Sequence, residues 1–120
     1  MAGLPVQHVI VGFGFGLMGL AAFLRPRVIV AMVGIVGNTP DSRNEIQAVY
    51  GGFGLAMAAA LAAPLWYPEL RAGIATAVGL ALAGMAAGRV IAALRERPGR
   101  WPIVFFVVEA VAAGLLLSTI

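Results

Sequence analysis

Long apolar stretches alternate with short polar turns along this chain. A helix that spans a bilayer needs about 20 predominantly apolar residues, and four segments reach that length. They cover residues 6–24, 42–63, 68–95 and 102–119. Short breaks rich in arginine and proline separate them, at Arg25-Pro26-Arg27, Pro64 to Pro68 and Arg97-Pro98-Gly99-Arg100. The pattern predicts an all-α, integral membrane four-helix bundle that forms a single domain over residues 1–120.

The starts of the first two helices carry further signals. The first stretch has the length of a signal peptide, but no Lys or Arg precedes it. Because signal peptides begin with a positively charged region, we interpret this stretch as a helix of the mature protein. At the second helix, Ser42 and Glu45 have the S-x-x-E spacing of a capping box, in which both side chains bond free N–H groups. This spacing places the start of the helix at about Ser42.

A shorter apolar segment, residues 28–37, lies between the first two helices. As a helix its ten residues rise only about 15 Å, half of the roughly 30 Å hydrocarbon core. An extended strand would leave its backbone groups unpaired in lipid. We therefore predict an interfacial or re-entrant helical segment that ends at Gly37-Asn38. A fifth membrane span is the alternative.

Composition excludes most soluble classes. Hydrophobic residues make up 62% of the chain and charged residues 11%, against about 25% charged residues in ordinary soluble domains. A soluble fold of this size could not bury so much apolar surface. Cysteine is absent, which excludes disulfides, thiolate metal sites and a cysteine nucleophile. The formal charge of +3 comes from arginines at helix ends, where it indicates topology and lipid headgroups rather than nucleic acid.

The arginines are distributed unevenly among the three loops. Cytoplasmic loops carry an excess of positive side chains. Six arginines fall in the first and third loops, namely Arg25, Arg27, Arg43, Arg95, Arg97 and Arg100, while Arg71 alone falls in the second. The asymmetry predicts a multi-pass membrane protein with both termini outside or in the periplasm.

The glycine spacing of one segment suggests a nucleotide site, but the position of that segment in the chain excludes one. Residues 14–19 match G-x-G-x-x-G, which binds dinucleotides only between a strand and a helix. Here the motif lies inside a membrane helix. Small residues four apart instead allow membrane helices to approach closely, within the bundle or between copies. Four such pairs are Gly12 with Gly16, Gly54 with Ala58, Gly84 with Gly88 and Ala110 with Gly114.

Two opposite charges lie at matching depth in the third and fourth helices. Arg89 lies six residues, about 9 Å, inside the edge near Arg95, and Glu109 lies eight residues, about 12 Å, inside the same edge near Trp101. We expect Arg89 and Glu109 to pair, because charges at such depth rarely face lipid. Such a pair is either a functional site or a structural contact that fixes helix register.

Polar residues also mark the start of the second helix. A helical wheel places Gln47 and Tyr50 on one face with Arg43. Glu45 falls on the opposite face with Gly52, Ala56 and Ala63, a small-residue face that we expect to pack inward. Tyr50 lies about 10 Å deep, level with the Arg89–Glu109 pair, so it either joins a polar cluster or fills core space. The candidate ligand, ion or structural cluster is thus Glu45, Gln47, Tyr50, Arg89 and Glu109.

His8 is the single histidine, near the outer edge of the first helix. With no acid close in sequence it cannot form a metal site, and we expect it to lie at the interface. No cofactor-binding motif is evident, so no cofactor is expected.

The run Asn44-Glu45-Ile46-Gln47-Ala48-Val49-Tyr50-Gly51-Gly52 resembles the signature of a family of small bacterial four-helix membrane proteins. That family is catalogued as domain of unknown function 4345. Its usual pattern is Asn-Glu, an apolar residue, Arg-Ala, then Tyr-Gly-Gly, so Gln47 departs from the family's arginine. Gly88, Arg89 and Glu109 also resemble the family's polar positions. The resemblance implies a four-helix membrane fold in the bacterial inner membrane, with both termini periplasmic by the arginine count, and adds no activity.

Three functions compete on this sequence. The first is a non-enzymatic membrane component, either an accessory subunit of a larger complex or a binder of a lipid or amphiphile. The second is a small transporter or channel that uses the intramembrane Glu/Arg cluster. An enzyme ranks last, because no nucleophile–base pair or metal cluster is visible. The expected partners are membrane lipids, other subunits or a second copy, and not nucleic acid.

Overall fold

A computed structural model describes residues 3–34 and 39–120. Over these ranges the chain is mostly helical and contains no strand. The α-helices are α1 (Val6–Leu24), α2 (Pro26–Val33), α3 (Pro40–Ile46), α4 (Phe53–Ala62), α5 (Arg71–Ala93) and α6 (Arg100–Leu117). A π-helix, η1 (Gln47–Gly52), joins α3 to α4, and two 3₁₀ turns, η2 (Ala63–Leu65) and η3 (Pro68–Leu70), connect α4 to α5.

Four helical rods are long and apolar enough to cross a membrane. They are Val6–Leu24, Pro40–Leu65, Pro68–Ala93 and Arg100–Leu117. The second rod combines α3, η1, α4 and η2, and the third combines η3 with α5. The predicted all-α architecture is therefore confirmed, and the predicted ends differ from these by no more than two residues. The arrangement fits a small multi-pass membrane protein.

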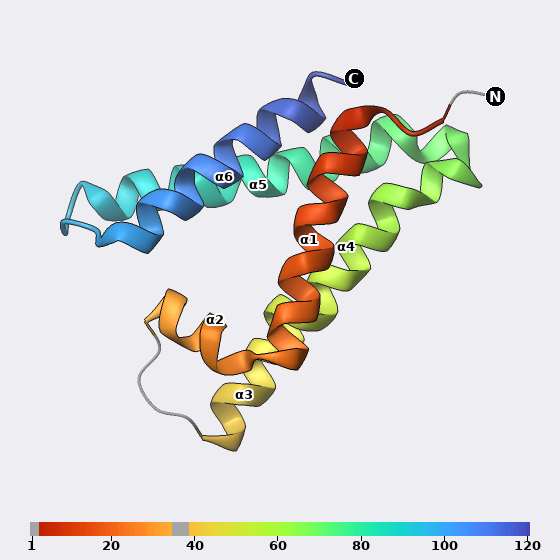
Figure 1. Cartoon of the computed structure of the whole chain (residues 1–120). Helices are drawn as coiled ribbons and strands as arrows, with labels where there is room; N and C mark the ends of the chain where they lie inside the picture. Colours follow the sequence, from red (N-terminus) through yellow and green to blue (C-terminus); the bar gives the residue numbers. More distant parts are fainter. Residues whose placement is uncertain (1–2, 35–38) are drawn as a thin grey trace.

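The four rods form two hairpins. α1 packs along η1 and α4, and α5 packs along α6, while fewer contacts join one hairpin to the other. The hairpins diverge from the end that holds both termini and the connection between α4 and α5 (Figure 1). We call this end the terminal end, and the opposite end, with residues 25–27, 39–47 and 94–101, the arginine-rich end. The molecule is flat, measuring 48 × 33 × 16 Å.

Glycines set the distance between the packed helices. A Cβ added to Gly54 would lie 2.9 Å from the main-chain oxygen of Phe15, and one added to Gly51 would lie 2.6 Å from the Phe23 ring. Gly19, opposite on α1, is equally crowded. Of the predicted small-residue pairs, those in α1 and α4 lie in this contact. By contrast, a Cβ on Gly84, Gly88 or Gly114 would meet no described atom within 4 Å.

The second rod begins earlier than the capping box predicts. Thr39 is extended, and its side-chain oxygen accepts a 3.1 Å hydrogen bond from the Ser42 N–H. Pro40 follows at the first helical position, where its fixed φ suits a helix start. Ser42 therefore lies inside the first turn and Glu45 is exposed, so the predicted Ser42–Glu45 capping box is wrong.

One non-helical residue, Arg25, separates α1 from α2. Arg25 leaves helical geometry with φ −140°, and Pro26 starts the new helix. α2 ends at Gly34, whose φ of 73° lies in the left-handed region that glycine tolerates. Ile29 packs with Ala22 and Ile46 in a small core. The predicted helical character of this segment is confirmed as far as residue 33, whereas its predicted end at Gly37-Asn38 lies outside the described residues.

Candidate polar site at the arginine-rich end

The π-helix η1 coincides with part of the signature motif, Gln47 to Gly52. In a π-helix the backbone hydrogen bonds join residues five apart, so each turn holds about one residue more than a turn of α-helix. Each extra residue rotates everything beyond it by about 100°. Short π segments occur often at functional sites, where they re-aim side chains. The most specific part of the sequence therefore has a backbone unlike that of the helix on either side.

Arg89 and Glu109 form the predicted pair. The Arg89 Nε donates to Glu109 Oε1 at 2.7 Å, and its Nη2 donates to Oε2 at 2.8 Å. This two-pronged geometry is the strong form of an arginine–carboxylate contact. The Glu109 side chain is 8% exposed and that of Arg89 32%. Phe105, one turn from Glu109 on α6, places its ring 5.2 Å from the guanidinium carbon.

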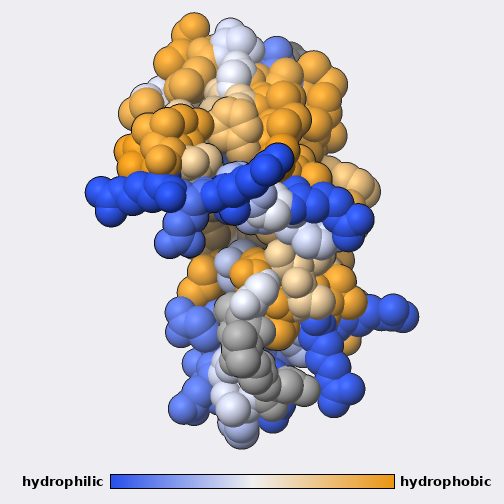
Figure 2. Space-filling model, turned by 90° about the vertical axis from the view of Figure 1, so that its left-hand side faces the viewer, coloured by the Kyte–Doolittle hydropathy of each residue, from blue (hydrophilic) through white to orange (hydrophobic). Residues whose placement is uncertain are grey.

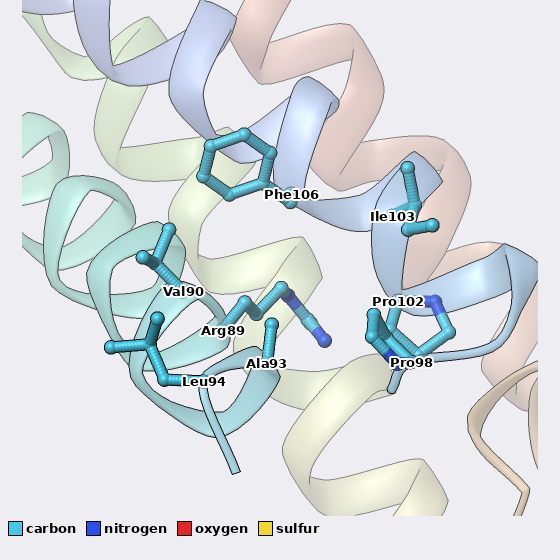
Figure 3. Close-up of a pocket in the computed structure, with 8 residues that line it drawn as sticks. All are labelled: Arg89, Val90, Ala93, Leu94, Pro98, Pro102, Ile103 and Phe106. Atoms are coloured by element: carbon cyan, nitrogen blue, oxygen red, sulfur yellow. The ribbon is translucent and has the colours of Figure 1, made fainter. Parts of the chain in front are cut away.

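An apolar pocket of about 230 Å³ adjoins this pair between α5 and α6. We call it the Arg89 pocket. Its lining residues are Arg89, Val90, Ala93, Leu94, Pro98, Pro102, Ile103 and Phe106. Arg89 extends from α5 between Ala93 and the two prolines (Figure 3). Among the described residues its Nη1 has no hydrogen-bond partner, so both N–H groups of Nη1 remain available.

Two residues of η1 lie near the pair without bonding to it. Tyr50 is half-buried and packs against the core of Ala22, Ile29 and Ile46. It lies close enough to Arg89 for an electrostatic interaction. Neither Tyr50 nor the half-buried Gln47 makes a side-chain hydrogen bond within the described ranges. Tyr50 thus packs at the edge of the small core and near Arg89, and both sequence interpretations of this residue stay open.

Glu45 stands apart from this site. It is exposed, as are Gly52 and Ala56, which share its predicted face. The prediction that this face packs inward is wrong for two reasons. Close approach to α1 uses Gly51 and Gly54 instead, and the extra residue of η1 invalidates a wheel drawn at a constant 100° per residue.

Three further arginines lie in or beside the loop that lines part of the Arg89 pocket. Arg95, Arg97 and Arg100 are all exposed, and the Arg100 guanidinium lies 5.2 Å from the Trp101 ring. Viewed from this end, hydrophilic residues form a band across the middle and gather again at the bottom, below a hydrophobic upper part (Figure 2). Such a boundary is typical of a membrane–water interface.

Sequence reasoning missed a second polar group, at the terminal end. His8 is 1% exposed, so neighbouring helices enclose its ring, while its position at the membrane interface stays a prediction. The reason is tertiary: α1 packs so that His8 lies beside Arg71, at the start of α5. The Arg71 Nη1 in turn donates a 2.6 Å hydrogen bond to the Thr119 carbonyl. These residues are far apart in sequence and share no spacing signal.

Comparison with known proteins supports the resemblance carried by the signature motif. The model of the family described as Domain of unknown function (DUF4345) matches residues 6–119. The chain belongs to this family. The match covers the four long helices, including η1 and the Arg89–Glu109 pair. No curated protein and no solved structure matches the chain. Within the described part of the chain, no cluster of three metal-ligating side chains occurs.

Proposed function

We propose that this protein is a non-enzymatic membrane component that binds an anionic amphiphile in the Arg89 pocket. The ligand class is a phospholipid or fatty acid whose acidic head lies at the arginine-rich end. The protein acts either alone or as an accessory subunit of a larger complex. The single observation that supports this proposal is the position of Arg89, which leaves Nη1 without a partner at the edge of an apolar cavity.

The pocket suits both parts of such a ligand, its acyl chain and its acidic head. Its other lining side chains are apolar, which favours an acyl chain. Glu109 orients the guanidinium through Nε and Nη2, so that Nη1 is free to donate to a phosphate or carboxylate oxygen. A fixed donor loses little entropy on binding.

Net charge argues for an acidic head. Glu109 neutralises Arg89, so the pair alone attracts anions weakly. Arg95, Arg97 and Arg100 add three positive charges at the same end and Glu96 one negative charge, so this loop carries a net charge of +2. Each basic residue near an anionic membrane surface contributes about 1 kcal/mol of attraction. Together they favour a lipid with a net negative head over a zwitterionic one.

A thermal-shift comparison tests the proposal. Purified protein in detergent receives either phosphatidylglycerol or phosphatidylcholine of identical chain length. Phosphatidylglycerol is expected to raise the unfolding midpoint more, because only its head is anionic. Ala93→Phe, which fills the pocket, should remove that preference, and so should the double variant Arg89→Met with Glu109→Gln.

The matched control is Ala81→Phe, which adds the same bulk at an exposed position of the same helix and should keep the preference. Equal shifts with both lipids, or an unchanged preference in Ala93→Phe, would contradict lipid binding here. Glu109-dependent proton or cation uptake by liposomes that contain only this protein would assign the pair to transport instead.

A further inference from the structure

The core that joins the two hairpins lies at the terminal end. Val11 and Leu61 of the first hairpin pack there with Val78 and Leu116 of the second. Toward the arginine-rich end the hairpins diverge (Figure 1), and far fewer contacts join them than hold each hairpin together. The position of one hairpin relative to the other therefore depends on the groups that meet at the terminal end.

His8 of α1 brings a polar group into this contact between the hairpins. The residue is 1% exposed, and neither ring nitrogen has a hydrogen-bond partner among the described residues. The neighbour of the ring from the second hairpin is Arg71, the first residue of α5. Its main-chain carbonyl lies near the ring but does not meet hydrogen-bond geometry. The ring thus lies between the two hairpins, enclosed away from water.

The charge beside the ring is positive. The Arg71 guanidinium acts on the ring through its charge, and its Nη1 donates a 2.6 Å hydrogen bond to the Thr119 carbonyl just after α6. On α1 and α4, the residues that line a cavity together with His8 are all apolar. Glu69 of η3, two residues before Arg71, is exposed. Among the described residues, no carboxylate forms an ion pair with His8.

A protonated ring does not suit this closed contact. An imidazolium has two N–H donors, and the Arg71 carbonyl can accept from only one of them. The charge would be buried without a counter-ion and next to a second cation, and an unpaired buried charge is very costly. In water, by contrast, an imidazole takes up a proton at about pH 6.5. Protonation of His8 is therefore coupled to exposure of its ring, which requires the hairpins to separate around it.

We propose that His8 and Arg71 form an acid-sensitive contact between the hairpins, which is closed while the ring is neutral and opens at the terminal end once the ring is protonated. The open form binds more protons than the closed form. The contact therefore keeps its full strength above about pH 6.5 and weakens as the pH falls below that value. The arginine count predicts that this end faces the periplasm, so the pH on that side controls the contact.

Distances between spin labels test the proposal, because the chain has no cysteine of its own. The labels are attached through Val6→Cys on α1 and Leu80→Cys on α5, at positions that are 64% and 59% exposed. The protein is placed in nanodiscs of phosphatidylcholine and studied from about pH 8 to about pH 4.5, on both sides of the range in which imidazole titrates. We expect a longer distance to gain population as the pH falls. A distance distribution that stays constant overturns the proposal.

Two variants assign the response to the ring. His8→Phe fills a similar volume but cannot take up a proton, so its hairpins should stay closed over the whole pH range. Glu69→Gln removes the exposed acid nearest in sequence to Arg71 and is the matched control, which should keep the response. The same opening in His8→Phe as in the unchanged protein, or loss of the opening in Glu69→Gln, overturns the proposal.

The proton itself can be followed without any variant of the histidine. Imidazole ¹⁵N resonances in this chain arise from His8 alone, so protein labelled with ¹⁵N-histidine reports the fraction of protonated ring at each pH. That fraction and the population of the longer distance should rise together. A ring that titrates fully while the distance stays constant overturns the proposal, whether or not His8→Phe folds.

The contact is independent of the ligand proposed for the Arg89 pocket. The double variant Arg89→Met with Glu109→Gln removes the other buried acid, Glu109, together with the proposed anion site. It should still open as the pH falls. Loss of the opening in this variant would assign the response to the Arg89–Glu109 pair and overturn the proposal. Equal effects of the two lipids in the thermal-shift comparison would contradict the proposed function alone, so the two proposals can fail separately.

Discussion

At the scale of single residues, Arg89 and Glu109 depend on each other. Two hydrogen bonds of 2.7 and 2.8 Å hold the pair, and the Phe105 ring lies against the guanidinium. Glu109 is the more enclosed partner. If Arg89 were removed, the carboxylate would stay in a low-dielectric setting without its counter-charge, which is the costly way to disturb a buried pair.

The pair should therefore show strong coupling in a double-mutant cycle. Arg89→Met and Glu109→Gln should each destabilise the protein by about 1–3 kcal/mol. The double variant should cost less than the two single losses added together. Thermal unfolding in detergent measures the cycle. Losses that add to within about 0.5 kcal/mol would show that the two side chains do not interact in the folded protein.

Gly54 and Gly84 should respond oppositely to the same substitution. Gly54→Ala forces a Cβ to within 2.9 Å of a main-chain oxygen, and such overpacking costs about 1–3 kcal/mol. Gly84→Ala meets open space and gains helix propensity, worth up to about 1 kcal/mol. Unfolding midpoints of both variants check the contrast. Equal midpoints would mean that α1 and α4 are not in close contact at Gly54.

At the scale of elements, sequence reasoning succeeded for features that residues close together in the sequence determine. It failed for features that depend on contacts between distant parts of the chain. Hydrophobic length alone locates the four rods, and counting from their ends predicts that Arg89 meets Glu109. The π-helix has no comparable signal in the sequence, and it lies where Gly51 packs against Phe23 of α1. The wrong face assigned to Glu45 follows directly from that omission. The burial of His8 was missed because its neighbour Arg71 comes from another hairpin.

α2 is predicted to lie along one membrane surface. Its eight residues rise about 12 Å, less than half of the hydrocarbon thickness. Single cysteines at Arg27 and Asp41 should therefore react with an impermeant thiol reagent from the same side. The chain has no cysteine of its own, so the background is clean. Labelling from opposite sides would require a fifth crossing and reverse the orientation of everything that follows.

At the scale of the whole molecule, both ends of the chain lie on one side. Figure 1 shows the two termini at the same end, as four crossings require. The arginine count then predicts that this side faces the periplasm. In a bacterial host, reporter fusions that are active only in the periplasm should be active at either terminus. Activity of a cytoplasmic reporter at the C-terminus would contradict the orientation.

The angle between the hairpins is a property that hydropathy could not supply. Apolar residues that face lipid and those that face another helix look alike in sequence, because both environments are apolar. Val107 and Val111 are exposed on α6, whereas Ala113 and Leu116 of the same helix are buried. Only contacts such as Gly79 against Leu117 show which faces meet.

The crowded glycines should also leave different marks on the family's evolution. Gly51 abuts the outer atoms of the Phe23 ring, so a larger residue at 51 can be compensated by a smaller one at 23, and the two positions should covary among relatives. Gly54 abuts the main-chain oxygen of Phe15, which every amino acid possesses. No exchange at position 15 can relieve that crowding. An alignment of the family should therefore show position 54 fixed as glycine without any covarying partner.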